Sequence, residues 1–151
     1  MGAWVSGVIC IGLLVGGMEE PALKADDILG LWRTEEGKST VEVYTCGDRY
    51  CGKIVDLKFK VYPPDDPQGM AGQERVDRNN VDESRRDTPL LGLVLMEGFT
   101  FNGTLWRDGT IYDPENGKTY KCKIRLMEDG RLKLRGYVGA PALGRTSFWT
   151  R

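Results

Sequence analysis

Apolar and polar residues alternate with a period of two along several short stretches of the chain. The clearest stretch is residues 120–126, where apolar positions alternate with basic ones. Residues 132–138 repeat the alternation after a turn at 128–130, which is typical of a hairpin with a short glycine-containing loop. Pairing Leu126 with Leu132 keeps both apolar sets on one side of the sheet. The pattern therefore predicts an antiparallel hairpin with one buried face.

Further strands are predicted from the same alternation or from short runs of aromatic and β-branched residues. They span residues 28–34, 40–45, 53–57, 91–96, 99–101, 105–112 and 145–150. Asn102-Gly103 indicates another hairpin, and Asp108-Gly109 indicates a bulge within a strand. Closure into a barrel would satisfy the strand edges, so the sequence predicts an all-β antiparallel barrel of about eight strands. An open sandwich is the alternative.

Residues 58–89 break the alternation. They contain four prolines, many charges and few apolar residues. We expect a long excursion over the surface with one helical turn near residues 83–86, forming part of the rim or lid of the barrel.

The first 25 residues differ from the rest of the chain. Residues 4–17 form a continuous apolar or small stretch of 14 residues, which is too short for a spanning helix and suits a signal-peptide core. We expect a signal peptide at residues 1–25, a single barrel domain at 26–151, and a periplasmic or secreted protein. An uncleaved anchor or a misassigned start codon are the alternatives.

Composition excludes several classes of function. The 151 residues carry a formal net charge of −1, and residues 26–151 sum to zero. This balance argues against nucleic acid as a partner. The chain has no histidine, which removes Ser-His, Cys-His and His-metal sites. Aspartate and asparagine clusters at 65–66, 77–83 and 113–116 lack EF-hand spacing and suit turns. We therefore expect no metal, no cofactor and no catalytic residues, and an enzyme is the less favoured reading.

Cys46 and Cys51 lie at the two shoulders of a predicted hairpin. In an oxidising compartment we expect a structural disulfide between them. A redox pair is the alternative, but the spacing is not Cys-x-x-Cys. Cys122 lies on the apolar face of its strand, where a free cysteine behaves as a small hydrophobe.

From Gly30 to Arg151 the chain resembles a family of small exported bacterial proteins classed as a domain of unknown function. The resemblance is carried by Gly30-Leu31-Trp32, residues 51–55, Asp77-Arg78-Asn79-Asn80, Pro89-Leu90-Leu91-Gly92, residues 109–120, residues 135–139 and Gly144-Arg145-Thr146. It implies a lipocalin-like barrel and no particular reaction. Gly30-Leu31-Trp32 and Arg145 also resemble the Gly-x-Trp and closing-strand arginine of the wider lipocalin superfamily, which implies that Arg145 stacks on Trp32 at the closed end.

Three functions remain open at this point. The first is binding of a small apolar or amphipathic ligand in the cell envelope, with an interior lined by Tyr44, Trp106, Tyr112 and Phe148. The second is an interaction domain whose interior is packed solid. The third is an unrecognised hydrolase.

The outer face of the 120–138 hairpin is unusually basic. The predicted register sets Lys123 opposite Arg135 and Arg125 opposite Lys133, and like charges in direct opposition are destabilising. Acids on a flanking strand or solvent would relieve the repulsion. Alternatively, the face is a basic ridge that meets an anionic partner such as the envelope surface.

Overall fold

The computed structural model describes residues 2–3, 7–13 and 16–151 of the chain. Eight antiparallel strands form one sheet in sequential order. The strands are β1 (Gly30–Arg33), β2 (Ser39–Cys46), β3 (Arg49–Leu57), β4 (Val94–Phe101), β5 (Trp106–Asp113), β6 (Lys118–Leu126), β7 (Leu132–Tyr137) and β8 (Arg145–Trp149). Four short 3-10 helices accompany them: η1 (Ala25–Ile28), η2 (Glu35–Gly37), η3 (Glu83–Arg85) and η4 (Pro141–Leu143).

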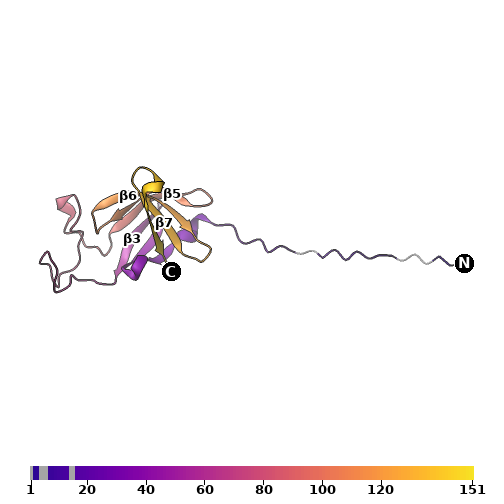
Figure 1. Cartoon of the computed structure of the whole chain (residues 1–151), viewed down its shortest axis with the longest axis horizontal. Coiled ribbons are helices and arrows are strands. Elements are labelled where there is room, and N and C mark those ends of the chain that lie inside the picture. Colours follow the sequence, from indigo (N-terminus) through magenta and orange to yellow (C-terminus); the bar gives the residue numbers. More distant parts are fainter. Residues whose placement is uncertain (1, 4–6, 14–15) are drawn as a thin grey trace.

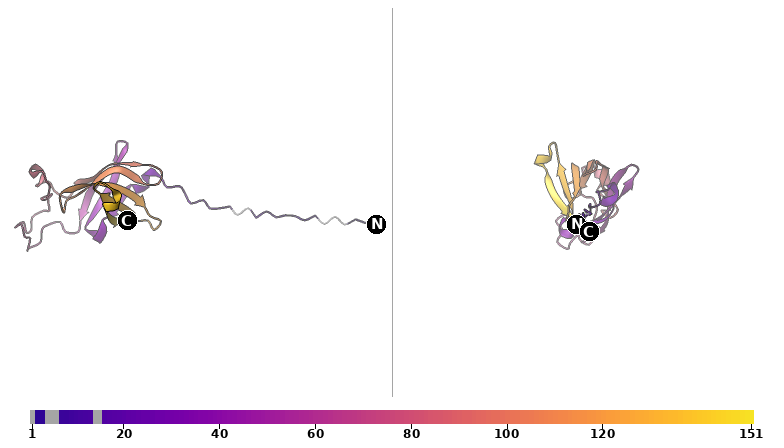
Figure 2. Two further views of the ribbon diagram at one scale, coloured as in Figure 1. Left: turned by 45° about the horizontal axis from the view of Figure 1, so that its top comes forward. Right: turned by 90° about the vertical axis from the view of Figure 1, so that its right-hand side faces the viewer.

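The sheet curls into a nearly closed barrel (Figure 1). Arg33 and Thr150 exchange both backbone hydrogen bonds, at 2.7 and 3.0 Å, and so join the first strand to the end of the last. The two flanks of the sheet lie opposite each other when the molecule is viewed from its N-terminal side (Figure 2). The predicted all-β antiparallel barrel of about eight strands is thus confirmed.

Most local predictions hold in the structure. Leu126 pairs with Leu132, and a register shift between Trp106 and Gly109 marks the predicted bulge. The helical turn predicted near 83–86 is η3. The predicted cysteine hairpin is present and has a two-residue turn, because Cys46 pairs with Arg49.

Two boundary predictions are wrong. The strand predicted through Val138 ends at Tyr137 in the structure, so Val138 lies beyond the strand and is exposed. Ile28 was expected to begin the first strand, but it lies in η1 and is buried beneath the barrel. In both cases the alternation continues one or two residues past the point where strand pairing stops.

One end of the barrel is packed with aromatic side chains. Trp32, Trp106 and Phe99 are fully buried there. The indole nitrogen of Trp32 donates to the Ile28 carbonyl at 2.8 Å, and that of Trp106 donates to the Ala25 carbonyl at 3.0 Å. Both bonds satisfy buried indole N–H groups, and together they fix η1 as a floor under the barrel.

The segment 58–93 connects β3 to β4 as a long loop that projects from the barrel (Figure 1). Tyr62 is its buried centre, and its hydroxyl both donates to the Val76 carbonyl and accepts from the Val76 N–H. The Arg78 guanidinium lies over the Tyr62 ring, 4.1 Å from its centroid, and pairs with Asp66 at 3.0 Å. The loop therefore has a small core of its own.

Residues 16–24 lead away from the barrel without forming a helix or a strand (Figure 1). Of the predicted signal peptide at 1–25, residues 1, 4–6 and 14–15 lie outside the described residues. The signal segment therefore stays a prediction. No helix among the described residues is long and apolar enough to cross a membrane.

Candidate functional site

The barrel encloses a cavity of about 460 Å³ at the end opposite the aromatic floor. Seven strands supply side chains to it, and η2, the β5–β6 turn and the β7–β8 loop surround its mouth. Its deeper wall is mainly apolar and includes Ile54, Leu95, Ile111, Leu134 and Trp149. The arrangement is that of a cup with an apolar base and one open side.

Small residues at inward positions keep this part of the barrel empty. Gly136 lies on β7 where the alternation from Leu132 and Leu134 points inward, and it pairs with Cys122 on β6. A β-carbon at Gly136 would meet only ordinary contacts, the nearest at 3.6 Å from Tyr120. Ser147, which pairs with Leu134 in register, is a second small residue at an inward position, on β8. The cavity therefore results from side-chain size and not from a gap in the sheet.

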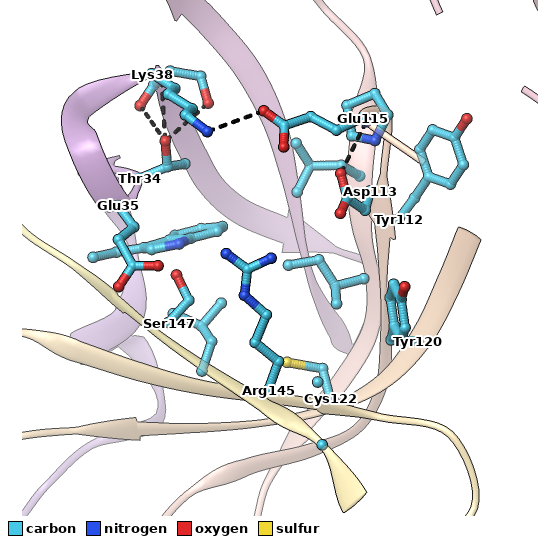
Figure 3. A pocket seen from close by; sticks show the side chains of 18 of the residues that line it. Thr34, Glu35, Lys38, Tyr112, Asp113, Glu115, Tyr120, Cys122, Arg145 and Ser147 are labelled. Atoms are coloured by element: carbon cyan, nitrogen blue, oxygen red, sulfur yellow. Dashed lines mark hydrogen bonds and ion pairs between the residues drawn. The ribbon is translucent and has the colours of Figure 1, made fainter. Parts of the chain in front are cut away.

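The mouth of the cavity is polar and charged. The Lys38 ammonium lies 3.2 Å from Glu115 and 3.3 Å from Glu36, and its hydrogen bond to Glu115 raises the pKa of Lys38. Arg145 extends its guanidinium into the middle of the pocket (Figure 3). Within the described part of the chain, that guanidinium makes no hydrogen bond or ion pair. Arg145 is therefore a cation that a ligand could engage.

Cys122 contributes a thiol to the cavity wall (Figure 3). Burial raises the pKa of Cys122 to about 12. A thiol with a raised pKa is protonated at neutral pH and is a poor nucleophile. Cys122 thus acts as a small apolar wall residue, in agreement with its position in the sequence pattern.

The long loop is fastened to the rim of the barrel by buried polar groups. Asp77 is 1% exposed and accepts hydrogen bonds from the Tyr112 hydroxyl at 2.7 Å and from the Asn80 amide at 2.7 Å. Burial and the bond to Asp77 raise the pKa of Tyr112 well above its usual range. The Asn79 amide donates to the carbonyls of Pro114 and Glu115 at 3.0 Å. Two motifs that are far apart in the sequence, 77–80 and 109–120, therefore meet here.

The long loop does not cover the cavity. We expected residues 58–89 to form part of the rim or lid, but none of them lines the cavity. Several residues between 77 and 88 instead border a second hollow of about 530 Å³ beside β4, β5 and β6, which shares Leu95 and Tyr112 with the cavity wall. The loop is therefore not a lid, because its bonds to Tyr112 and to the β5–β6 turn hold it beside the rim of the barrel.

The four predicted lining residues lie in different places. Tyr112 lies at the cavity wall, at the edge of the view in Figure 3. Trp106 is part of the aromatic floor. Tyr44 and Phe148 lie outside the cavity lining, beside Lys53 and Arg131 respectively. The structure does not bring the four together, and a role of any of them in binding stays a prediction.

The arginine that stacks on Trp32 is Arg151 and not Arg145. The Arg151 guanidinium lies 4.3 Å from the Trp32 ring centroid and donates to the carbonyls of Asp27 and Leu29. Arg145 begins β8 at the mouth of the cavity, whereas Arg151 follows the strand at its other end. The resemblance therefore implied the correct interaction but the wrong residue.

Sequence reasoning missed Gly136, Ser147 and Lys38 as parts of the site. Gly136 and Ser147 carry a readable signal, because both fall on inward positions of strands whose other inward residues are large. Lys38 carries none, because its position depends on a turn. The predicted disulfide between Cys46 and Cys51 is present. Among residues 2–3, 7–13 and 16–151 there is no group of three or more acidic, cysteine or histidine residues that could hold a metal ion.

Comparison with known proteins gives a family and a fold. A family model described as "Uncharacterized protein conserved in bacteria (DUF2147)" matches residues 30–151. A solved structure similar to this chain is described as protein HP1028 from the human pathogen Helicobacter pylori, which belongs to the lipocalin family. The two chains share 20% identity with a TM-score of 0.66 over 82% of this chain and 81% of that one. No curated protein matches the chain.

Proposed function

The chain belongs to the family of uncharacterised bacterial proteins DUF2147, and from that premise we propose that its lipocalin-like barrel binds one small amphipathic molecule. The observation that carries the proposal is the cavity of about 460 Å³ inside the barrel. Pockets for small molecules span roughly 300–1,000 Å³ and combine an apolar lining with a few polar groups. A barrel whose only task is to present its surface would fill this space with side chains.

The two halves of the cavity fit the two halves of such a ligand. The apolar part would lie against Leu95, Leu134 and Trp149, where burial of hydrocarbon supplies roughly 25 cal/mol per Å². The polar part would lie at the mouth, where Arg145 has no partner among the described residues. A guanidinium recognises carboxylate and phosphate groups well. We therefore expect the polar part to be anionic.

We further propose that the protein works outside the cytoplasm, in the cell envelope. The apolar stretch at 4–17 supports export, and the disulfide between Cys46 and Cys51 suits an oxidising compartment. Membership of the lipocalin family by HP1028 supports a binding role by analogy of fold.

The test is titration of the purified protein with 1-anilinonaphthalene-8-sulfonate, an apolar fluorophore with one sulfonate. We expect saturable binding of one probe per chain, confirmed by native mass spectrometry. Gly136→Leu and Ser147→Leu place a side chain in the cavity and should each abolish this binding. Thr45→Leu is the matched control, because Thr45 is exposed on β2 and should leave binding unchanged.

Two outcomes contradict the proposal. Wild-type protein that shows no saturable binding would favour a domain that acts through its surface alone. Equal loss of binding in Gly136→Leu and in Thr45→Leu would place the probe outside the cavity. Circular dichroism of each variant separates loss of binding from loss of fold.

A further inference from the structure

The outer face of β6 and β7 carries basic side chains that no acid opposes. Lys123 pairs in register with Arg135, and Arg125 pairs with Lys133. Lys121, Lys123 and Arg125 are exposed, and Lys133 is half-buried. None of these four makes an ion pair within the part of the chain that the structure describes. We call Lys121, Lys123, Arg125 and Lys133 the basic face.

Neighbouring strands do not relieve the repulsion within the basic face. The residues paired with it on β5 and β8 are Thr110 beside Lys121 and Phe148 beside Lys133. Asp108 lies in the bulge of β5, but it accepts a hydrogen bond from Thr100 and pairs with Arg107. Like charges in direct opposition destabilise a sheet. The arrangement therefore costs stability, which a partner of opposite charge would offset.

Over the whole domain, basic residues are concentrated in the C-terminal part of the chain and acidic residues in the part before it. Residues 116–151, which form β6, β7 and β8, contain nine basic and two acidic residues, a net charge of +7. Residues 26–115 contain eleven basic and eighteen acidic residues, a net charge of −7. A neutral domain thus presents one strongly positive side, which attracts anionic surfaces over about a Debye length.

The edge of the basic face is apolar and borders the mouth of the cavity. Val138 is 68% exposed and Leu143 is 83% exposed, and both lie in the β7–β8 loop, Leu143 as the last residue of η4. Arg135 holds that loop in place by donating to the carbonyls of Pro141 and Ala142 and to the Thr146 hydroxyl. Both apolar residues also line the cavity mouth.

We propose that the basic face docks the protein onto an anionic lipid membrane, with Val138 and Leu143 entering the interfacial region. Three of the four basic residues are lysines, which are flexible point charges suited to a fluid array of headgroups and less suited to a fixed bidentate partner. Basic residues beside exposed apolar ones are typical of interfacial binding. Docking in this way would place the β7–β8 side of the cavity mouth close to the membrane surface.

The test is flotation of the full chain with vesicles of phosphatidylcholine alone and of phosphatidylcholine with an equal amount of phosphatidylglycerol. Each basic residue at an anionic surface contributes about fivefold to the partition coefficient. The variant K121Q/K123Q/R125Q/K133Q should therefore lose more than tenfold in binding to the anionic vesicles. The variant K53Q/K58Q/K60Q/R85Q removes the same charge elsewhere and should lose far less. Raised salt should weaken wild-type binding.

Pure phosphatidylcholine vesicles measure any binding by the apolar N-terminal segment, which all variants share. Equal loss in the two charge variants would overturn the proposal, because net charge alone would then explain binding. So would wild-type binding that is equal on both vesicle types. Two further outcomes would overturn the proposal if the basic-face variant still floats with anionic vesicles. Loss of binding to polyglutamate would assign the face to an acidic protein. Loss of self-association in sedimentation would assign it to a second copy of the chain.

Discussion

The two ends of the barrel are built from the same strands and have opposite interiors. At the floor, inward positions carry Trp32, Phe99 and Trp106, whose large side chains are fully buried. At the mouth, the inward positions carry Gly136, Cys122 and Ser147, and a cavity remains. The comparison shows that alternation decides which side chains point into the barrel. Their size decides whether the interior is a packed core or a cavity, and we call the half with the cavity the container end.

The largest expected difference between the two ends follows from Trp32→Ala. Removing a fully buried indole should cost roughly 3–5 kcal/mol of unfolding free energy, and it also leaves the Ile28 carbonyl and Arg151 without their partner. Trp149→Ala should cost less, because Trp149 already borders the cavity. Urea unfolding followed by circular dichroism measures both. Equal losses would mean that the two ends are packed alike.

Removal of the disulfide should lower the free energy of unfolding without changing ligand binding in the cavity. Cys46 and Cys51 enclose a short loop at the tip of the β2–β3 hairpin, so Cys46→Ser with Cys51→Ser should cost about 2 kcal/mol on the chain-entropy estimate. Affinity for the fluorescent probe should stay within twofold of wild type, on the order of 0.4 kcal/mol. A parallel fall in affinity and stability would show that the two ends are coupled.

Alkaline pH should test the burial of Cys122 at the container end. Its pKa is about 12 in the folded protein and about 8.5 in an unfolded chain. The folded state therefore favours the protonated thiol, and this stability is complete below pH 8.5 and is lost as the pH rises toward 12. The slope should be about 1.4 kcal/mol per pH unit in that window. Cys122→Ala should remove this component of the slope in urea titrations at several pH values; an unchanged slope would contradict the burial.

The smallest effects come from the two arginines at the ends of β8. Arg151→Gln should cost about 1 kcal/mol, because the stacking on Trp32 and two bonds to carbonyls are lost. Arg145→Gln should change stability by less than about 0.5 kcal/mol and should weaken binding of the sulfonate probe. Paired unfolding and binding titrations check this contrast. Equal effects on stability would remove the distinction between a structural and a free arginine.

Much of the fold could be predicted because it depends on local alternation. The register of Leu126 with Leu132 and the bulge at 108–109 follow from neighbouring residues. Parity along the strands also indicates that Phe148 faces outward, since it lies between Ser147 and Trp149, which line the cavity. The prediction that Phe148 lines the interior conflicts with this alternation, and Phe148 lies outside the cavity.

The alternation of inward and outward positions along β8 does not distinguish Arg145 from Arg151 as the residue that stacks on Trp32. The two residues are an even number of positions apart, so both suit an inward position, and only the level of the floor along the strand decides which one meets Trp32. Similarly, Asp77 has the local sequence of a turn residue. Its burial against Tyr112 is a contact between positions 35 residues apart, and nothing in the local pattern indicates it.

The two backbone hydrogen bonds between Arg33 and Thr150 determine where the barrel wall can open beside the cavity. Within residues 16–151 they are the point where β1 and the end of β8 are joined, and from there to Arg145 the free edge of β8 faces η2 without a ladder. The barrel is thus closed by backbone hydrogen bonds near its floor, whereas beside the cavity β8 has no strand partner on this edge. A ligand wider than the cavity mouth could enter by displacing η2 from the edge of β8, while every hairpin of the barrel stays intact.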